Sequence, residues 1–394
     1  MNAAWRLTLA AAALMALASG GRAATGLFVS PLNGASGLGL AALSLLLALG
    51  QLAVGFAQPL VGHWADRFGA ARVIVVGAVA LAASTALPAW SVLPGAVALS
   101  LIASAVASSA VGSNGLLLGE VSRRLGPARS GAAVGLIGAG ASVGQMLAGP
   151  ALQGAIDWRG WPWAMLALAA LSLLAWPLAL PLRRSPSAAP RAPAQPVADV
   201  LRDARFWRVA ASFGVCGFHV AFLTVHMPGV IERCGLPASL AGSWIAVAGA
   251  ANIAGSLLVG AALRRHDAGW LLVALYGVRA LGIVMLLLLP PTAELMIAFA
   301  LVMGASHMAT LPPTTQLVAR AHGVERLGTL FGVVMLVHQL GSFAGIWLGG
   351  VLAEASGSDR PLWSIDIALA LLAAALVWPQ RARHAFPAAV AHGA

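Results

Sequence analysis

Long apolar runs recur along almost the whole chain, and they restrict its fold more than any other feature. Twelve of these runs are long enough to cross a bilayer as a helix, which takes about 20 residues. They cover residues 7–29, 38–61, 73–89, 93–118, 131–156, 163–182, 209–231, 240–263, 270–289, 293–318, 327–352 and 362–378. With 60% hydrophobic and 9% charged residues, the 394-residue chain cannot be an ordinary soluble protein. We predict an all-α membrane protein with twelve transmembrane helices.

The first run allows two interpretations. Arg6, followed by the apolar residues 7–18, resembles a secretory signal peptide. The apolar sequence resumes after Arg22 and continues to Val29, which gives one interrupted helix of membrane-spanning length. We therefore interpret the run as a retained first helix.

One long polar interval, residues 183–208, divides the chain almost evenly. It is rich in Pro and Ala and contains six Arg, which is typical of a linker, and we expect a short helix in it near residues 197–205. The basic sequence 264–267 follows the second run of the later half and looks like a degenerate copy of residues 62–72 in the first half. Such internal similarity is typical of transporters built from repeated halves. We predict an N-terminal six-helix bundle (1–182), a cytoplasmic linker (183–208) and a C-terminal six-helix bundle (209–394).

Arginine is distributed asymmetrically between the two ends of the runs. All 23 basic residues are Arg: 18 lie in the termini and in the loops after even-numbered runs, three lie in the opposite loops, and Arg22 and Arg279 lie within runs. Because basic residues accumulate on the cytoplasmic side of membrane proteins, we expect both termini in the cytoplasm. The net charge of +11 is spread between apolar runs, so it does not indicate nucleic-acid binding.

The interval after the second run reads Gly62-His-Trp-Ala-Asp66-Arg67-Phe-Gly69-Ala-Ala-Arg72. We expect a short loop that brings Asp66, Arg67 and Arg72 together at one membrane face, with Gly62 and Gly69 allowing the backbone to turn. Asp66 can accept hydrogen bonds from arginine or from a helix N-terminus. The pattern G-x-x-x-D-R-x-G-x-x-R resembles the loop between helices two and three of the major facilitator superfamily. We expect it to act in the conformational cycle.

Further segments strengthen the resemblance and place it near bacterial monocarboxylate-porter-like and oxalate/formate-antiporter-like members. They are Gly21-Arg22-x-x-x-Gly26-Leu-Phe28, Gly55-Phe-Ala-Gln58-Pro59, Gly144-Gln145 and His338-Gln339-Leu-Gly341. The resemblance implies two six-helix bundles, a central substrate cavity and alternating access. It also has a departure: residues 251–256 carry no charge where animal monocarboxylate transporters have an Asp/Arg pair, and the chain has no Lys.

Two arginines within the runs are candidate anion-binding residues. Arg22 lies in the outer half of the first helix, which lines the cavity in the resembled fold, and its planar fork suits a carboxylate. A snorkelling or internally paired Arg22 is the alternative. Arg279 lies midway along the ninth helix near Tyr276, where a structural role is as well supported as a functional one.

Several polar residues in the later spans could bind substrate or protons, or simply join helices. His219 and His307 lie on helices expected to face the cavity and are the better candidates for a proton relay; His226 and His338 are the others. Asn114, Asn252 and Gln339 could bind substrate or bridge helices, as could Thr310 and Thr314. Pro312-Pro313 should interrupt the tenth helix.

We predict a secondary active transporter of a small organic anion, favouring a monocarboxylate, with protons as a second partner. It would act as a monomer in the lipid bilayer of a bacterial inner membrane. The alternatives are an efflux pump for lipophilic compounds and a non-transporting membrane sensor. The sequence contains no nucleophile–base, phosphate-binding or metal-spaced motif, so we expect neither an enzyme nor a cofactor.

Overall fold

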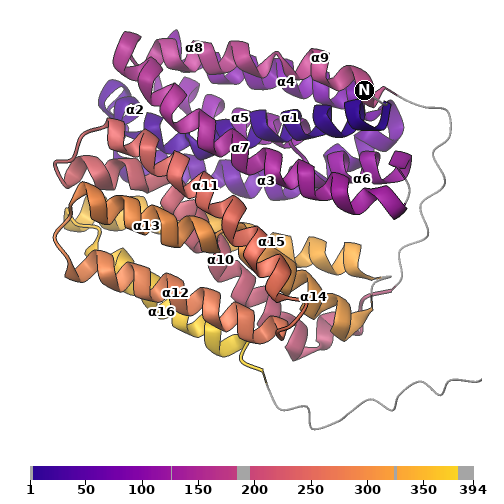
Figure 1. Cartoon of the computed structure of the whole chain (residues 1–394). Coiled ribbons are helices and arrows are strands. Elements are labelled where there is room, and N and C mark those ends of the chain that lie inside the picture. The colour runs from indigo at the N-terminus through magenta and orange to yellow at the C-terminus, as the bar shows by residue number, and fades with distance from the viewer. Residues whose placement is uncertain (1–2, 126, 184–195, 324–325, 380–394) are drawn as a thin grey trace, which may run out of the picture.

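The computed structural model describes residues 3–125, 127–183, 196–323 and 326–379. Every regular element in these ranges is a helix, and the helices run side by side along one direction (Figure 1). Eleven helical stretches are long and apolar enough to cross a membrane. The twelfth, α16 (Arg360–Leu376), is 17 residues long. The prediction of an all-α, twelve-helix membrane protein is confirmed.

Six spans precede the linker, and several of them contain breaks. They are α1 (Ala3–Ala23) with η1 (Thr25–Phe28) and α2 (Val29–Ser36); α3 (Leu40–Phe68); α4 (Ala70–Ala86) with η2 (Leu87–Ala89); α5 (Pro94–Val111) with α6 (Asn114–Leu125); α7 (Pro127–Arg159); and α8 (Trp161–Ser172) with α9 (Ala175–Ala179) and η3 (Leu180–Leu182).

Six more spans follow the linker. They are α10 (Ala204–Arg233); α11 (Ser239–Ala262); α12 (Ala268–Leu288); α13 (Ala293–Ser306) with η5 (Met308–Thr310) and α14 (Leu311–His322); α15 (Leu327–Ser356); and α16. The short helix expected in the linker is the three-residue η4 (Val200–Arg202), and α10 begins five residues before the predicted span. Linker residues 184–195 lie outside the described residues, and the division of the chain at 182 and 208 stays a prediction.

The segment 62–72 differs from the expected loop. Gly62 through Phe68 continue α3 as a helix, and α4 begins at Ala70, so Gly69 alone makes the turn. Its φ of 92° is a conformation that favours glycine. Gly62 was therefore wrongly expected to turn the chain. Asp66, Arg67 and Arg72 nevertheless lie at the same end of the molecule, and all three are exposed.

Backbone contacts between the earlier and the later helices identify two different ends. We call the end with Gly69 and the linker the motif end, and the other the far end. Near the far end, Gly350 on α15 lies against Ser44 and Leu40 on α3, and the Ala41 amide donates to Glu354 over 2.7 Å. A second contact of this kind joins Gly149 on α7 to Gly242 on α11.

On the same four helices, α3, α7, α11 and α15, the glycines that lie closer to the motif end face open space. A Cβ built at any of them would meet no heavy atom within 4 Å; they are Gly62 on α3, Gly135 and Gly138 on α7, Gly260 on α11, and Gly328 and Gly332 on α15. The earlier and later helices therefore pack together at the far end and leave these faces free toward the motif end.

Candidate substrate and proton site

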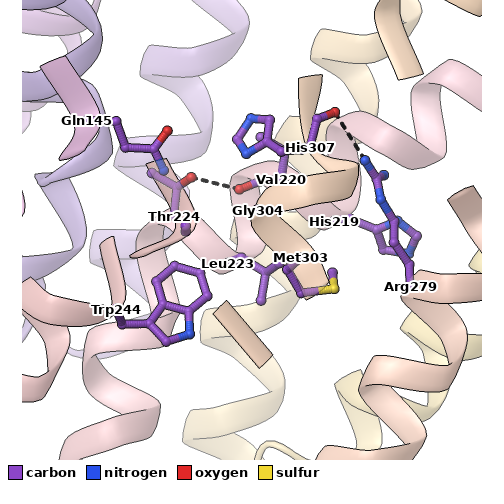
Figure 2. A pocket seen from close by; sticks show the side chains of 11 residues that line it. Gln145, His219, Val220, Leu223, Thr224, Trp244, Arg279, Met303, Gly304 and His307 are labelled. Carbon is purple, nitrogen blue, oxygen red and sulfur yellow. Dashed lines mark hydrogen bonds between the residues drawn. The ribbon is translucent and has the colours of Figure 1, made fainter. Parts of the chain in front are cut away.

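A small pocket lies where the later helices meet α7. Its polar wall is formed by Gln145 from α7, His219 and Thr224 from α10, Arg279 from α12 and His307 from the break in the tenth span (Figure 2). Trp244 and Met303 add apolar surface. The centre of a water molecule can occupy about 20 Å³ of the pocket, which is room for roughly one ordered water. In this conformation the pocket is therefore small.

Arg279 ties α12 to the interrupted tenth span. Its side chain is 1% exposed, and its Nε donates to Ser306 Oγ over 3.1 Å. Nη2 donates to the Ser306 carbonyl over 2.5 Å and to the His307 carbonyl over 3.2 Å. These are the carbonyls that the helix leaves unpaired where α13 ends. Nη1 has no hydrogen-bond partner in the described part of the chain.

The break itself lies one turn before the prolines. The tenth span was expected to be interrupted by Pro312-Pro313, but α13 ends at Ser306 and η5 covers residues 308–310. The two prolines instead occupy the first turn of α14, where a missing amide hydrogen is tolerated. Asn252 stabilises the break: its Oδ1 accepts from the Met308 amide over 3.0 Å, and its Nδ2 donates to Ser142 Oγ on α7 over 2.9 Å.

Asp366 is a buried carboxylate that the sequence analysis did not select. It lies on α16 and is 0% exposed, as is His219. The His219 Nε2 lies 2.8 Å from Asp366 Oδ1 and 3.1 Å from the Asp366 carbonyl oxygen. Only the carbonyl is aligned for a hydrogen bond, so neither carboxylate oxygen has a hydrogen-bond partner in the described ranges, and His219 Nδ1 lacks one too. A single acid inside the apolar run 362–378 was the sequence signal for this residue.

The structure brings four of the predicted binding residues together. His219, Arg279 and His307 line the pocket, and Asn252 holds the adjoining break. Gln339 lies at the contact of α15 with α3, where its Nε2 donates to the Gln51 carbonyl over 3.1 Å. Its Oε1 is 3.2 Å from His338 Nδ1.

Arg22 and Asn114 lie elsewhere. Arg22 is half-buried in the last turn of α1 and does not line the pocket. Its Nη2 donates to Ser19 Oγ over 3.2 Å, and no carboxylate of the described residues forms an ion pair with it. Asn114 is exposed at the first residue of α6, next to the break in the fourth span.

The sequence matches a known family over nearly its whole length. The family model described as Major Facilitator Superfamily matches residues 11–346 and 251–391. The chain belongs to the major facilitator superfamily. It is therefore a multi-pass membrane transporter and not an enzyme.

Solved structures of other major facilitator transporters share this fold at low identity. The nucleoside transporter NupG is 15% identical with a TM-score of 0.81, covering 95% of this chain and 99% of NupG. A D-xylose–proton symporter is 15% identical (TM-score 0.75; coverage 96% and 98%). A bacterial homologue of the human lysosomal transporter Spinster, inward-facing and unoccupied, is also 15% identical (TM-score 0.73; coverage 96% and 94%). No curated protein sequence matches the chain.

Proposed function

We propose that this transporter moves a small organic anion, with a monocarboxylate as the favoured substrate. The observation that carries the proposal is the presence of arginine side chains without carboxylate partners inside the membrane spans. Arg22 and Arg279 both lie within spans, and neither forms an ion pair with a carboxylate among the described residues. The pocket has an arginine and two histidines in its wall and no acidic residue among the residues that line it.

An anion entering such a space needs replacements for its water. A buried carboxylate without a cation and hydrogen-bond donors would lose several kcal/mol of solvation. A guanidinium supplies a fixed charge and two parallel donors that match the two carboxylate oxygens. The resemblance of the Gly21–Phe28 segment to monocarboxylate-porter-like members supports the same substrate class.

The asymmetry of arginine supports the orientation that accompanies this proposal. The motif end, with the linker and both termini, would face the cytoplasm of a bacterial cell, and the protein would lie in the inner membrane as a monomer. The conformation described here would then be closed toward the outside, because the two sets of helices contact each other at the far end.

Exchange in proteoliposomes tests the substrate class. Purified protein is reconstituted with unlabelled acetate, lactate, pyruvate or oxalate inside, and uptake of the same labelled carboxylate is measured. Saturable exchange of one or more of these supports the proposal. Export of lipophilic cations would identify an efflux pump instead, and carboxylate binding without flux would identify a sensor.

Arg22 provides the matched variants for this assay. Arg22→Lys keeps the charge and loses the fork, while Arg22→Gln loses both, so carboxylate affinity should fall in the order Arg, Lys, Gln. Loss of one charge-assisted contact corresponds to about 1.5–3 kcal/mol, or roughly 10- to 100-fold in affinity. Melting temperatures of the same preparations serve as the control. Unchanged affinity in folded Arg22→Gln would show that Arg22 does not bind the carboxylate.

A further inference from the structure

Among the described residues, three buried ionisable side chains in the later half of the chain have hydrogen-bonding atoms without a partner. They are His219 on α10 (Nδ1), Arg279 on α12 (Nη1) and Asp366 on α16 (Oδ1 and Oδ2). Buried polar atoms are nearly always paired in native proteins, so each exception needs an explanation. His219 connects the other two, because it lines the pocket with Arg279 and contacts Asp366, whereas Arg279 and Asp366 form no ion pair in the described part of the chain.

We propose that His219 and Asp366 form a proton-binding site, and that the proton it holds controls how Arg279 supports the break in the tenth span. An ionised Asp366 would be a fully buried carboxylate with no hydrogen bond to either oxygen among the described residues and no ion pair with Arg279, which is strongly unfavourable. One proton on the Asp366 carboxyl group removes that charge.

The pocket gives the proton a route. His219 lines the pocket (Figure 2), and its Nε2 lies 2.8 Å from Asp366 Oδ1. The step starts from the imidazole with its Nε2 hydrogen directed at the Asp366 carbonyl. A hydronium ion in the pocket protonates Nδ1, and the ring turns the Nε2 hydrogen to Oδ1, 2.8 Å away, and passes it to the ionised carboxylate. The products are a neutral Asp366, a neutral His219 with its hydrogen on Nδ1, and one water molecule.

Loss of the proton changes the partners available to Arg279. An ionised Asp366 attracts the unpaired Nη1, whereas the other nitrogens of Arg279 hold the Ser306 and His307 groups at the end of α13. The Arg279 guanidinium therefore moves toward Asp366 when the proton leaves. When the proton binds, it again donates its hydrogen bonds to Ser306 and His307 at the break. Proton occupancy on α16 is thereby linked to the order of η5, which adjoins the pocket.

Other titratable and charged groups on the packed elements share this environment. They are Cys216 and His226 on α10, Tyr276 on α12, His307 at the break and His338 on α15. Among the described residues of these elements near the pair, none but Asp366 is a carboxylic acid, so its vibrational signal can be separated from theirs.

Infrared difference spectroscopy on the purified full chain tests the proposal without any substrate. Difference spectra between the lowest and the highest pH at which the chain stays folded should show a protonated-carboxyl band. Asp366→Asn should lack this band, and Glu294→Gln, which changes an exposed carboxylate, should retain it. Asp366→Glu should shift the band, which keeps the test valid if Asp366→Asn does not fold. Spectra of Asp366→Asn or Asp366→Glu identical to the parent would overturn the proposal.

Hydrogen exchange at the break in the tenth span tests the second part of the proposal, the link between the proton on Asp366 and the order of η5. After correction for intrinsic rates, the amides of residues 307–311 should exchange several-fold faster at high pH than at low pH in the parent. In Asp366→Asn they should exchange slowly at both. A pH-independent parent, or a variant that responds like the parent, would contradict the link. The inference rests on the proposed function only for its role in coupling, because neither measurement requires carboxylate transport.

Discussion

The guanidinium of Arg279 shows how a charge can be kept inside a span. Three of its contacts are to groups at one helix end, and the ring of Tyr276 lies 5.6 Å away on its own helix. Tyr276 is itself fixed by a 2.6 Å hydrogen bond to the Ser212 carbonyl on α10. The arginine therefore supports the fold as well as the pocket wall, so the two roles left open by the sequence are not exclusive.

Replacing Arg279 should therefore change stability even without substrate. Arg279→Lys keeps one charge but cannot reach Ser306 and His307 in the same geometry, so we expect a loss of about 1.5–3 kcal/mol. Arg233→Lys is the control, because its bridge to Asp359 lies at the surface and exposed pairs contribute about 0–1 kcal/mol. Melting temperatures in detergent compare them, and equal shifts would show that Arg279 is not a structural anchor.

The sequence predicted individual residues unevenly. Arg22, His219, Arg279 and His307 stand out because a charge or an imidazole in an apolar run is unusual. Asp366 met the same criterion, and only the structure shows that it faces His219 on a helix 147 positions earlier in the chain. Gly62 was misassigned because a glycine permits a turn without requiring one, whereas the positive φ that decides the matter is a property of Gly69.

At the scale of elements, the interruption of the tenth span is the least regular part of the site. The chain passes from α13 through His307 and η5 to α14 while its free groups are taken up by Arg279 and Asn252. Hydropathy alone predicted that a helix lies here and that prolines disturb it. It could not place the break at residue 307, because that position depends on partners from α11 and α12.

Asn252→Leu should loosen this break. The change removes the acceptor for the Met308 amide and the link to Ser142, and an amide without its partner exchanges faster with water. We expect about tenfold faster exchange at Met308, since one hydrogen bond contributes about 1 kcal/mol or more. Gln316→Leu on α14 is the control, because its side-chain oxygen has no partner in the described residues. If both variants exchange alike, Asn252 does not hold the break.

At the scale of the whole molecule, the surroundings of the glycines indicate which helix surfaces are in contact in this conformation and which would have to come into contact later in the transport cycle. Gly149, Gly242 and Gly350 near the far end already lie against a facing backbone, whereas the six glycines named toward the motif end face open space on the same helices. Gly154, which follows Gly149 on α7, is an exception and also faces open space. Alternating access requires the second group to close when the first opens. Composition showed that the chain is glycine-rich, with 45 in total, but could not separate the two groups.

A bulky side chain on the open faces should therefore block half of the cycle. A Cβ atom at Gly332 on α15 would meet no heavy atom within 4 Å in the present conformation, and the indole ring of Gly332→Trp would obstruct closure at the motif end. We expect a folded protein that binds carboxylate from the motif end but exchanges it at least tenfold more slowly. Gly277→Trp on α12 is the matched control, because a Cβ atom there also meets no heavy atom within 4 Å. Equal exchange rates in the two variants would show that Gly332 does not lie on a closing surface.

The one-residue turn at Gly69 has a mechanical consequence. Neighbouring Cα atoms are about 3.8 Å apart, so a single residue between α3 and α4 leaves the chain no slack. When α3 tilts during the cycle, the start of α4 has to move with it, so the two helices move as one rigid hairpin. Flexible residues inserted after Gly69 would uncouple the movement of α4 from that of α3 without altering any side chain in the pocket.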